Sequence, residues 1–150
     1  MTLVRWSVGV LGIVVASVTP AFAQQPPAAG HVKVVSGSAF VVRGGSMIPA
    51  QPGQAIYQSD ALRTGADGAL GITLLDDTRV SLGPSSEVRV DRFLFAPGES
   101  GVGMVLKFMR GVAAYVSGRM AKLAPDSVRL ETPAAIVGVR GTTIAIRVEP

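Results

Sequence analysis

Apolar and polar residues alternate at every second position over most of the chain from residue 31 onward. Because successive side chains of a β-strand point to opposite faces, this alternation predicts strands with one buried and one exposed face. Gly, Pro, Asp or Ser residues interrupt the runs at intervals of about 8–12 residues, a spacing typical of turns between short strands. The pattern therefore predicts about nine to eleven strands. The clearest lie near residues 31–35, 38–43, 70–74, 78–82, 87–91, 104–108, 112–116, 128–132, 134–139 and 142–148.

The strongest local signal is a hairpin around Asp76 and Asp77, which lie between the alternating runs at residues 70–74 and 78–82. Two adjacent carboxylates could also serve acid–base chemistry or calcium binding. Their position between matched strands favours a turn, because Asp tolerates left-handed backbone geometry and can bond its own main chain.

Three segments interrupt the regular alternation. Residues 47–54 contain two prolines and a glycine, which predict a loop or an irregular edge. The alternation of residues 87–91 continues at Phe93 and Phe95 only after a shift of one position, which predicts a bulge or bend near Arg92. Residues 97–103 contain three glycines and are expected to form an exposed loop.

Residues 102–122 fit two patterns, because their apolar positions can be placed at helical spacing or in alternation. The alternating pattern gives one strand before Gly111 and another before Gly118. We predict strands, since Gly111 would lie in the middle of the helix and cost about 1 kcal/mol relative to Ala.

Together these patterns predict an all-β domain. The expected architecture is a rolled or β-helix-like sheet, with a β-sandwich as the alternative. No repeat of fixed period is strong enough to establish a solenoid.

Residues 1–23 have the layout of a secretory signal peptide. Arg5 precedes an apolar stretch at residues 8–18, and small residues lie before a predicted cleavage after Ala23. This stretch is shorter than the roughly 20 residues that a membrane-spanning helix needs, so an uncleaved anchor is the weaker alternative. The layout predicts export to the periplasm, with no membrane span after signal cleavage.

The remaining chain divides into two parts. Residues 24–30 read QQPPAAG, which predicts a short Pro-rich linker. Residues 31–150 are then expected to form one all-β domain, because this length suits a single core.

The composition offers little chemistry for catalysis. The chain contains no cysteine, which excludes disulfides and thiol chemistry. His31 is the single histidine and has no partners at a suitable spacing, so we expect it at the surface. Ser85, Ser86 and Ser117 lack both a nucleophile motif and a histidine to activate them. We therefore predict a non-enzymatic protein with no catalytic residues, no cofactor and no metal.

The formal net charge of +4 is modest, and the cations are dispersed along the chain. Few aromatic residues lie near them, so a nucleic-acid site is not expected. Their predicted role is to keep the surface soluble, with weak attraction to anionic envelope polymers as the alternative.

Residues 138–142 place two glycines around Arg140 and superficially resemble a phosphate loop. Such loops need a lysine and a following helix, whereas strand-forming residues follow here. We expect a tight corner between strands, with Arg140 pointing outward or paired with a carboxylate.

Residues 130–143 read LETPAAIVGVRGTT and resemble the core signature of the FecR-like domain, a periplasmic module first known from ferric citrate regulators. Residues 61–68 and 74–88 also resemble that family in the expected order, so the resemblance covers roughly residues 35–148. The signature residues are Thr132, Pro133, Gly138, Arg140, Gly141 and Thr142.

The resemblance implies an all-β periplasmic interaction domain, without known catalytic residues, that couples outer signals to other proteins. In the family's regulators a cytosolic anti-sigma segment and a membrane helix precede this domain. A cleavable signal peptide is predicted here instead, so direct contact with a sigma factor is not expected. The family's β-structure usually continues beyond the Gly-Thr strand, whereas this sequence ends at Pro150, so we expect the last strand to be an open edge.

The sequence thus predicts a periplasmic protein-interaction or scaffold module in envelope signalling, with a periplasmic or envelope protein as its partner. The partner is expected to add a strand to the open edge. That edge comprises Thr142, Ile144, Ile146 and Val148. The alternative is a cell-wall or carbohydrate-binding module, in which arginines and Tyr57 or Tyr115 contact the polymer.

Overall fold

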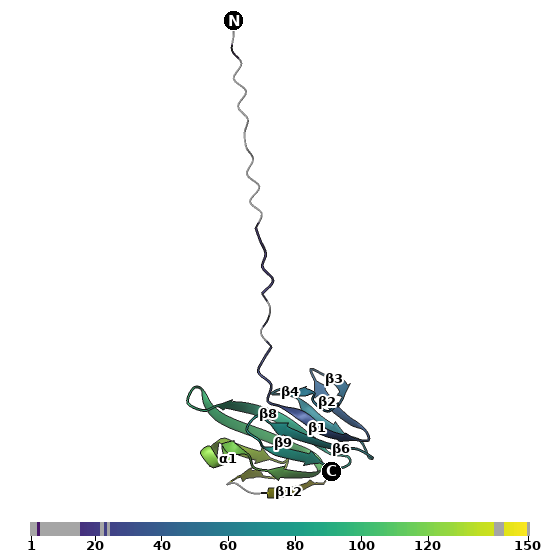
Figure 1. Cartoon of the computed structure of the whole chain (residues 1–150). Coiled ribbons are helices and arrows are strands. Elements are labelled where there is room, and N and C mark those ends of the chain that lie inside the picture. Colours follow the sequence, from purple (N-terminus) through teal and green to yellow (C-terminus); the bar gives the residue numbers. More distant parts are fainter. Residues whose placement is uncertain (1–2, 4–15, 22, 24, 140–142, 150) are drawn as a thin grey trace.

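The computed structural model describes residues 3, 16–21, 23, 25–139 and 143–149 (Figure 1). Twelve strands and two short helices occur in this part of the chain. The strands are β1 (Gly30–Ser36), β2 (Ala39–Arg43), β3 (Ser46–Pro49), β4 (Ala55–Ile56), β5 (Ala61–Thr64), β6 (Ala69–Leu74), β7 (Arg79–Leu82), β8 (Glu87–Ala96), β9 (Gly101–Val116), β10 (Val128–Glu131), β11 (Ile136–Gly138) and β12 (Thr143–Val148). The helices are α1 (Arg119–Leu123) and the 3-10 helix η1 (Pro125–Ser127).

Nine of the strands form one curled antiparallel sheet with the shape of half a barrel. Their order is β3-β2-β5-β8-β9-β7-β6-β1-β4. β7 and β8 follow one another along one side of the long strand β9, and β10 and β12 lie along its other side. The all-β class and the rolled sheet predicted from the sequence are confirmed.

The long strand β9 changes its pairing at Gly111, where its neighbour switches from β8 to β7. Gly111 has a φ of 85°, and a Cβ at this position would collide with Ser86. The buried Ser86 hydroxyl donates to the Val112 carbonyl at 3.0 Å and accepts from the Val112 N–H at 2.9 Å. Glycine and serine together therefore fix the point where the sheet bends.

Inward-facing side chains from both halves of the sheet and from α1 form one hydrophobic core. The largest fully buried members are Tyr115, Phe108, Ile56, Leu62, Leu70, Leu74, Met104, Leu106, Met120, Leu130, Val32 and Val41. Burial raises the pKa of the Tyr115 phenol, and the neighbouring Ser117 and Thr78 hydroxyls oppose part of that rise.

Several local predictions are confirmed. β6 and β7 form the expected hairpin, and Asp77 takes a left-handed φ of 69° in its turn. The pairing of β8 with β9 shifts between Val90 and Arg92, which is the predicted bulge. β3 ends at Pro49 and pairs only with β2 among the described strands, as expected of an edge.

Other local predictions need correction. The loop expected at residues 97–103 is shorter, because β9 already begins at Gly101 and pairs there with Ala96. Residues 102–116 are strand, as predicted, but they belong to the single strand β9 instead of two strands, and the helix α1 follows. Twelve strands exceed the expected number, partly because the two-residue strand β4 is too short to show alternation.

Candidate interaction site

The last strand, β12, lies at an open edge of the sheet. Thr143 to Val148 pair in antiparallel register with Val116 to Gly111 of β9. Among the described residues no strand pairs with the other side of β12. An unpaired strand edge presents main-chain donors and acceptors that can accept a further strand.

The direction of the β12 backbone groups follows from the hydrogen bonds of β9. Gly83 N–H donates to the Val112 carbonyl at 2.9 Å, so Val112 directs its main-chain groups toward the chain of β7 and β8. Because these groups alternate in direction along a strand, Ala113 and Tyr115 direct theirs toward β12. Their register partners on β12 are Ile146 and Ile144, which therefore bond to β9.

The intervening residues Ala145 and Arg147 consequently direct their N–H and C=O groups toward the open edge. Both residues are exposed, and Arg147 has no carboxylate within 4 Å among the described residues. The apolar residues that were predicted to form the edge face the core instead of the open side. Ile144, Ile146 and Val148 are partly buried against the core, and Thr142 lies outside the described residues.

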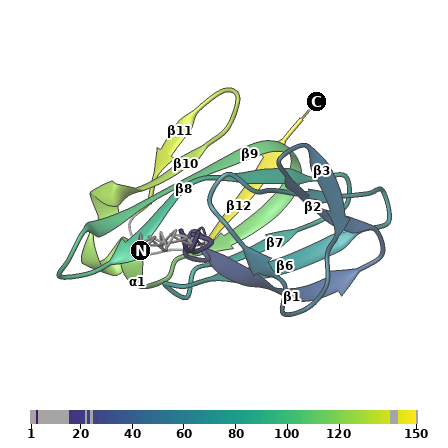
Figure 2. The same cartoon turned by 90° about the horizontal axis from the view of Figure 1, so that it is seen from above.

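The signature residues from 132 to 138 form the tip and outer strand of the β10–β11 hairpin, which projects from the rest of the sheet (Figure 2). Thr132 N–H donates to the Ala135 carbonyl at 2.8 Å, and the Thr132 hydroxyl accepts from the Ala135 N–H at 3.1 Å. Pro133 follows Thr132 in this tight turn, where its fixed φ suits the geometry. The motif thus encodes a turn, while Arg140, Gly141 and Thr142 lie outside the described residues.

The outer strand of this hairpin leaves apolar side chains uncovered. Ile136 is 67% exposed and Val137 is 37% exposed, whereas Val139, just beyond β11, is buried. The sequence predicts a strand at residues 134–139, and β11 forms within it at Ile136–Gly138.

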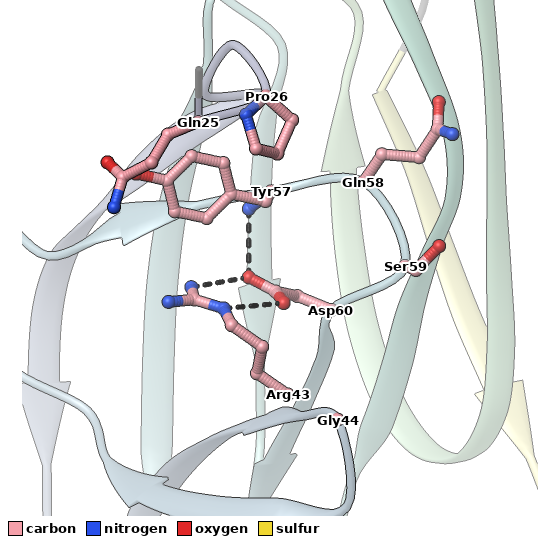
Figure 3. Close-up of a pocket in the computed structure, with 8 residues that line it drawn as sticks. All are labelled: Gln25, Pro26, Arg43, Gly44, Tyr57, Gln58, Ser59 and Asp60. Atoms are coloured by element: carbon pink, nitrogen blue, oxygen red, sulfur yellow. Dashed lines mark hydrogen bonds and ion pairs between the residues drawn. The ribbon is translucent and has the colours of Figure 1, made fainter. Parts of the chain in front are cut away.

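A hollow of about 300 Å³ lies beside Arg43, Tyr57 and Asp60 (Figure 3). The buried Asp60 carboxylate accepts two hydrogen bonds from the Arg43 guanidinium, at 2.9 and 2.7 Å. It also accepts the Tyr57 N–H at 2.8 Å, and the guanidinium lies 4.6 Å from the centre of the Tyr57 ring. Gln25 and Pro26 border the same hollow.

This arrangement neutralises both charges of the Arg43–Asp60 pair. The hydrogen bonds that the Arg43 guanidinium donates to Asp60 raise the pKa of that guanidinium. The pair therefore braces β2 against the segment after β4, and the Tyr57 ring and Pro26 are apolar elements of the hollow. Its two members lie 17 residues apart without a shared motif, so no local pattern indicated this ion pair.

The buried Asp76 does more than complete a turn. Its carboxylate accepts the Thr78 N–H at 3.1 Å, the Thr78 hydroxyl at 2.8 Å and the Met120 N–H at 3.2 Å. The last bond connects the β6–β7 turn to α1. The predicted turn is confirmed, whereas the hydrogen bond between Asp76 and α1 was not predicted from the sequence.

Among the residues considered for catalysis, Asp77 and Ser117 border one hollow. His31 is half-buried in β1, and Ser86 uses its hydroxyl at the bend of β9. Within residues 25–139 and 143–149, no group of three His, Cys, Asp or Glu side chains could bind a metal ion.

None of the helices in the described part of the chain is long and apolar enough to cross a membrane.

These features define a curled all-β protein with an open strand edge and a projecting signature hairpin. A family model described as FecR protein matches residues 60–150, which include all three motif segments. The chain belongs to the FecR family. This is a regulatory family associated with envelope signalling, and it is not known as enzymatic. No curated protein and no solved structure matches the chain significantly.

Proposed function

We propose that the protein is a non-enzymatic periplasmic interaction module that binds an extended segment of another envelope protein along β12. The observation that supports this most directly is the pairing of β12 with β9 on one side only among the described residues. The family's association with envelope signalling favours a protein partner. Export would follow from cleavage after Ala23, with residues 24–30 as the linker and residues 31–150 as the domain.

The residues of the open edge indicate which kind of partner segment can pair with β12. The N–H and C=O groups of Ala145 and Arg147 would form main-chain bonds with an added strand. Ala145 is small enough to leave room for a larger neighbour on the outer face. Arg147 favours a partner with an acidic residue at the opposite position, because opposite charges across strands stabilise pairing.

The test compares two substitutions at one position, Ala145→Pro and Ala145→Thr. Proline removes the N–H at the open edge and is tolerated on edge strands, whereas threonine keeps the N–H and favours a strand. We expect Ala145→Pro to abolish capture of a defined envelope partner from periplasmic extract, and Ala145→Thr to preserve it.

A second control separates binding from folding. Ile146→Pro removes an N–H that bonds to β9, so this variant should lose thermal stability as well as capture. Capture by Ala145→Pro at the level of the unsubstituted protein would exclude the open edge as the binding site.

The second candidate function is binding of a cell-wall or carbohydrate polymer. Tyr57 borders a hollow and supports this candidate, whereas Tyr115 is fully buried and cannot contact a polymer. Sedimentation with purified peptidoglycan at low and high salt distinguishes the two candidates, because strand addition does not depend on the wall polymer.

A further inference from the structure

The cations of the protein are paired very unevenly. Twelve lysines and arginines lie among the described residues. Seven have a carboxylate within 4.0 Å, namely Arg43, Arg63, Arg89, Lys107, Arg110, Arg119 and Arg129. The other five have none among the described residues, namely Lys33, Arg79, Arg92, Lys122 and Arg147.

Three of these five unpaired cations border a single hollow of about 480 Å³. We call it the cationic hollow. Its charged and hydroxyl-bearing lining includes Lys33, Thr73, Asp77, Arg79, Arg119 and Lys122. Four cations therefore surround one carboxylate. This cluster is unbalanced, whereas most other arginines of the described residues have a carboxylate partner.

The sheet brings the first two cations to the same face. Arg79 on β7 lies directly opposite Thr73 on β6. The register between β1 and β6 shifts between Val32 and Val34, which makes Lys33 the extra residue of a bulge. Lys33 and Val34 are both exposed as a result. Bulges commonly redirect a side chain, and this one directs a lysine to the hollow.

The helix α1 supplies the other two cations, Arg119 and Lys122. The Arg119 guanidinium donates to the Leu75 carbonyl at 3.0 Å and lies 3.1 Å from the Asp77 carboxylate. It also lies 5.0 Å from the centre of the Phe95 ring. These three contacts restrict the Arg119 side chain before any ligand binds, although it is 57% exposed, and so lower the cost of ordering it on binding.

We propose that the cationic hollow binds an anion of the phosphate class. Clustered cations repel each other, so an anion with several oxygens stabilises them together. Guanidinium groups suit phosphate because they donate two hydrogen bonds in a fixed geometry, and lysines add mobile donors. A free polyphosphate and a phospholipid head group share this chemistry. The proposal is independent of the β12 edge.

The test uses tripolyphosphate as the soluble probe, with the full chain and isothermal titration. We expect one saturable site per chain. Arg79→Gln and Lys33→Gln should each weaken binding about tenfold, as expected for the loss of one charge-assisted contact.

The matched control is Arg92→Gln, which removes the same charge from an exposed strand arginine that also lacks a carboxylate partner among the described residues. It should weaken binding less than about twofold, because only long-range attraction is lost. Ala145→Pro should leave tripolyphosphate binding unchanged, so failure of the strand-addition proposal can be recognised separately.

Vesicles identify the source of the phosphate. Cosedimentation with phosphatidylglycerol but not phosphatidylcholine vesicles, lost in Arg79→Gln, indicates a lipid head group. Tripolyphosphate binding without cosedimentation indicates a soluble anion. Binding of neither probe, or equal weakening in Arg79→Gln and Arg92→Gln, would overturn the proposal.

Discussion

At the scale of single residues, the two buried carboxylates Asp60 and Asp76 are stabilised in different ways. Asp60 faces the Arg43 guanidinium, so its charge is paired. Asp76 accepts hydrogen bonds from two N–H groups and one hydroxyl instead. A carboxylate can remain buried on such bonds alone, provided that each donor has a partner.

Asp76→Asn should therefore destabilise the fold. The amide replaces one acceptor oxygen by a donor, which leaves at least one buried donor without a partner. We expect a loss of about 1–3 kcal/mol in the free energy of unfolding, measured by urea denaturation. The neighbouring Asp77→Asn is the control and should change stability by less than about 0.5 kcal/mol, because its ion pair is exposed. Equal effects of the two substitutions would show that Asp76 does not link the turn to α1.

At the scale of elements, the long strand β9 joins the parts of the sheet that contain β7 and β8. Gly111 and Ser86 meet at the point where β9 changes neighbours. Both strand halves were predicted from alternation, because each has one dry face. Their union into one strand was not, since a glycine with positive φ inside a strand looks the same in sequence as a turn.

Gly111→Ala tests this bend against Gly98→Ala. Both glycines have a positive φ, but a Cβ at Gly98 meets no atom within 4 Å, whereas one at Gly111 collides with Ser86. Gly98→Ala should cost only the conformational strain of about 1–2 kcal/mol. Gly111→Ala should cost more by at least about 1 kcal/mol and lower the melting temperature further, as followed by circular dichroism. Equal costs would mean that the bend can relax without its contact to Ser86.

At the scale of the whole molecule, the strands and the family can be predicted from the sequence, whereas the strand pairing cannot, apart from the β6–β7 hairpin. Period-two alternation depends on local burial, so it identified β6, β7 and β10. The cationic hollow and the β12 edge both depend on contacts between residues far apart in the sequence. The cationic hollow combines residue 33 with residues 79 and 119–122. Likewise, only the register of β12 with β9 shows that Ala145, rather than Ile144, presents its main chain to the edge.

The same topology predicts that the molecule unfolds as one unit. β9 pairs with β8 and β10 in its first half and with β7 and β12 in its second, so neither half of the sheet is complete without it. Leu106→Ala creates a cavity beside the first half of β9, and Leu74→Ala creates one in β6, on the side of the sheet next to the second half of β9. Both residues are fully buried, so each substitution should cost about 2–5 kcal/mol.

If β9 couples the halves, each variant should accelerate hydrogen exchange in β2 and β6 alike, measured by mass spectrometry on peptides from both strands. Exchange that accelerates only in the substituted half would instead show two separately stable units. Coupling has a consequence for binding at β12. A partner strand added to β12 would contact the sheet through β9, which also pairs with the strands of the other half. Its binding would therefore stabilise the whole domain rather than β12 alone.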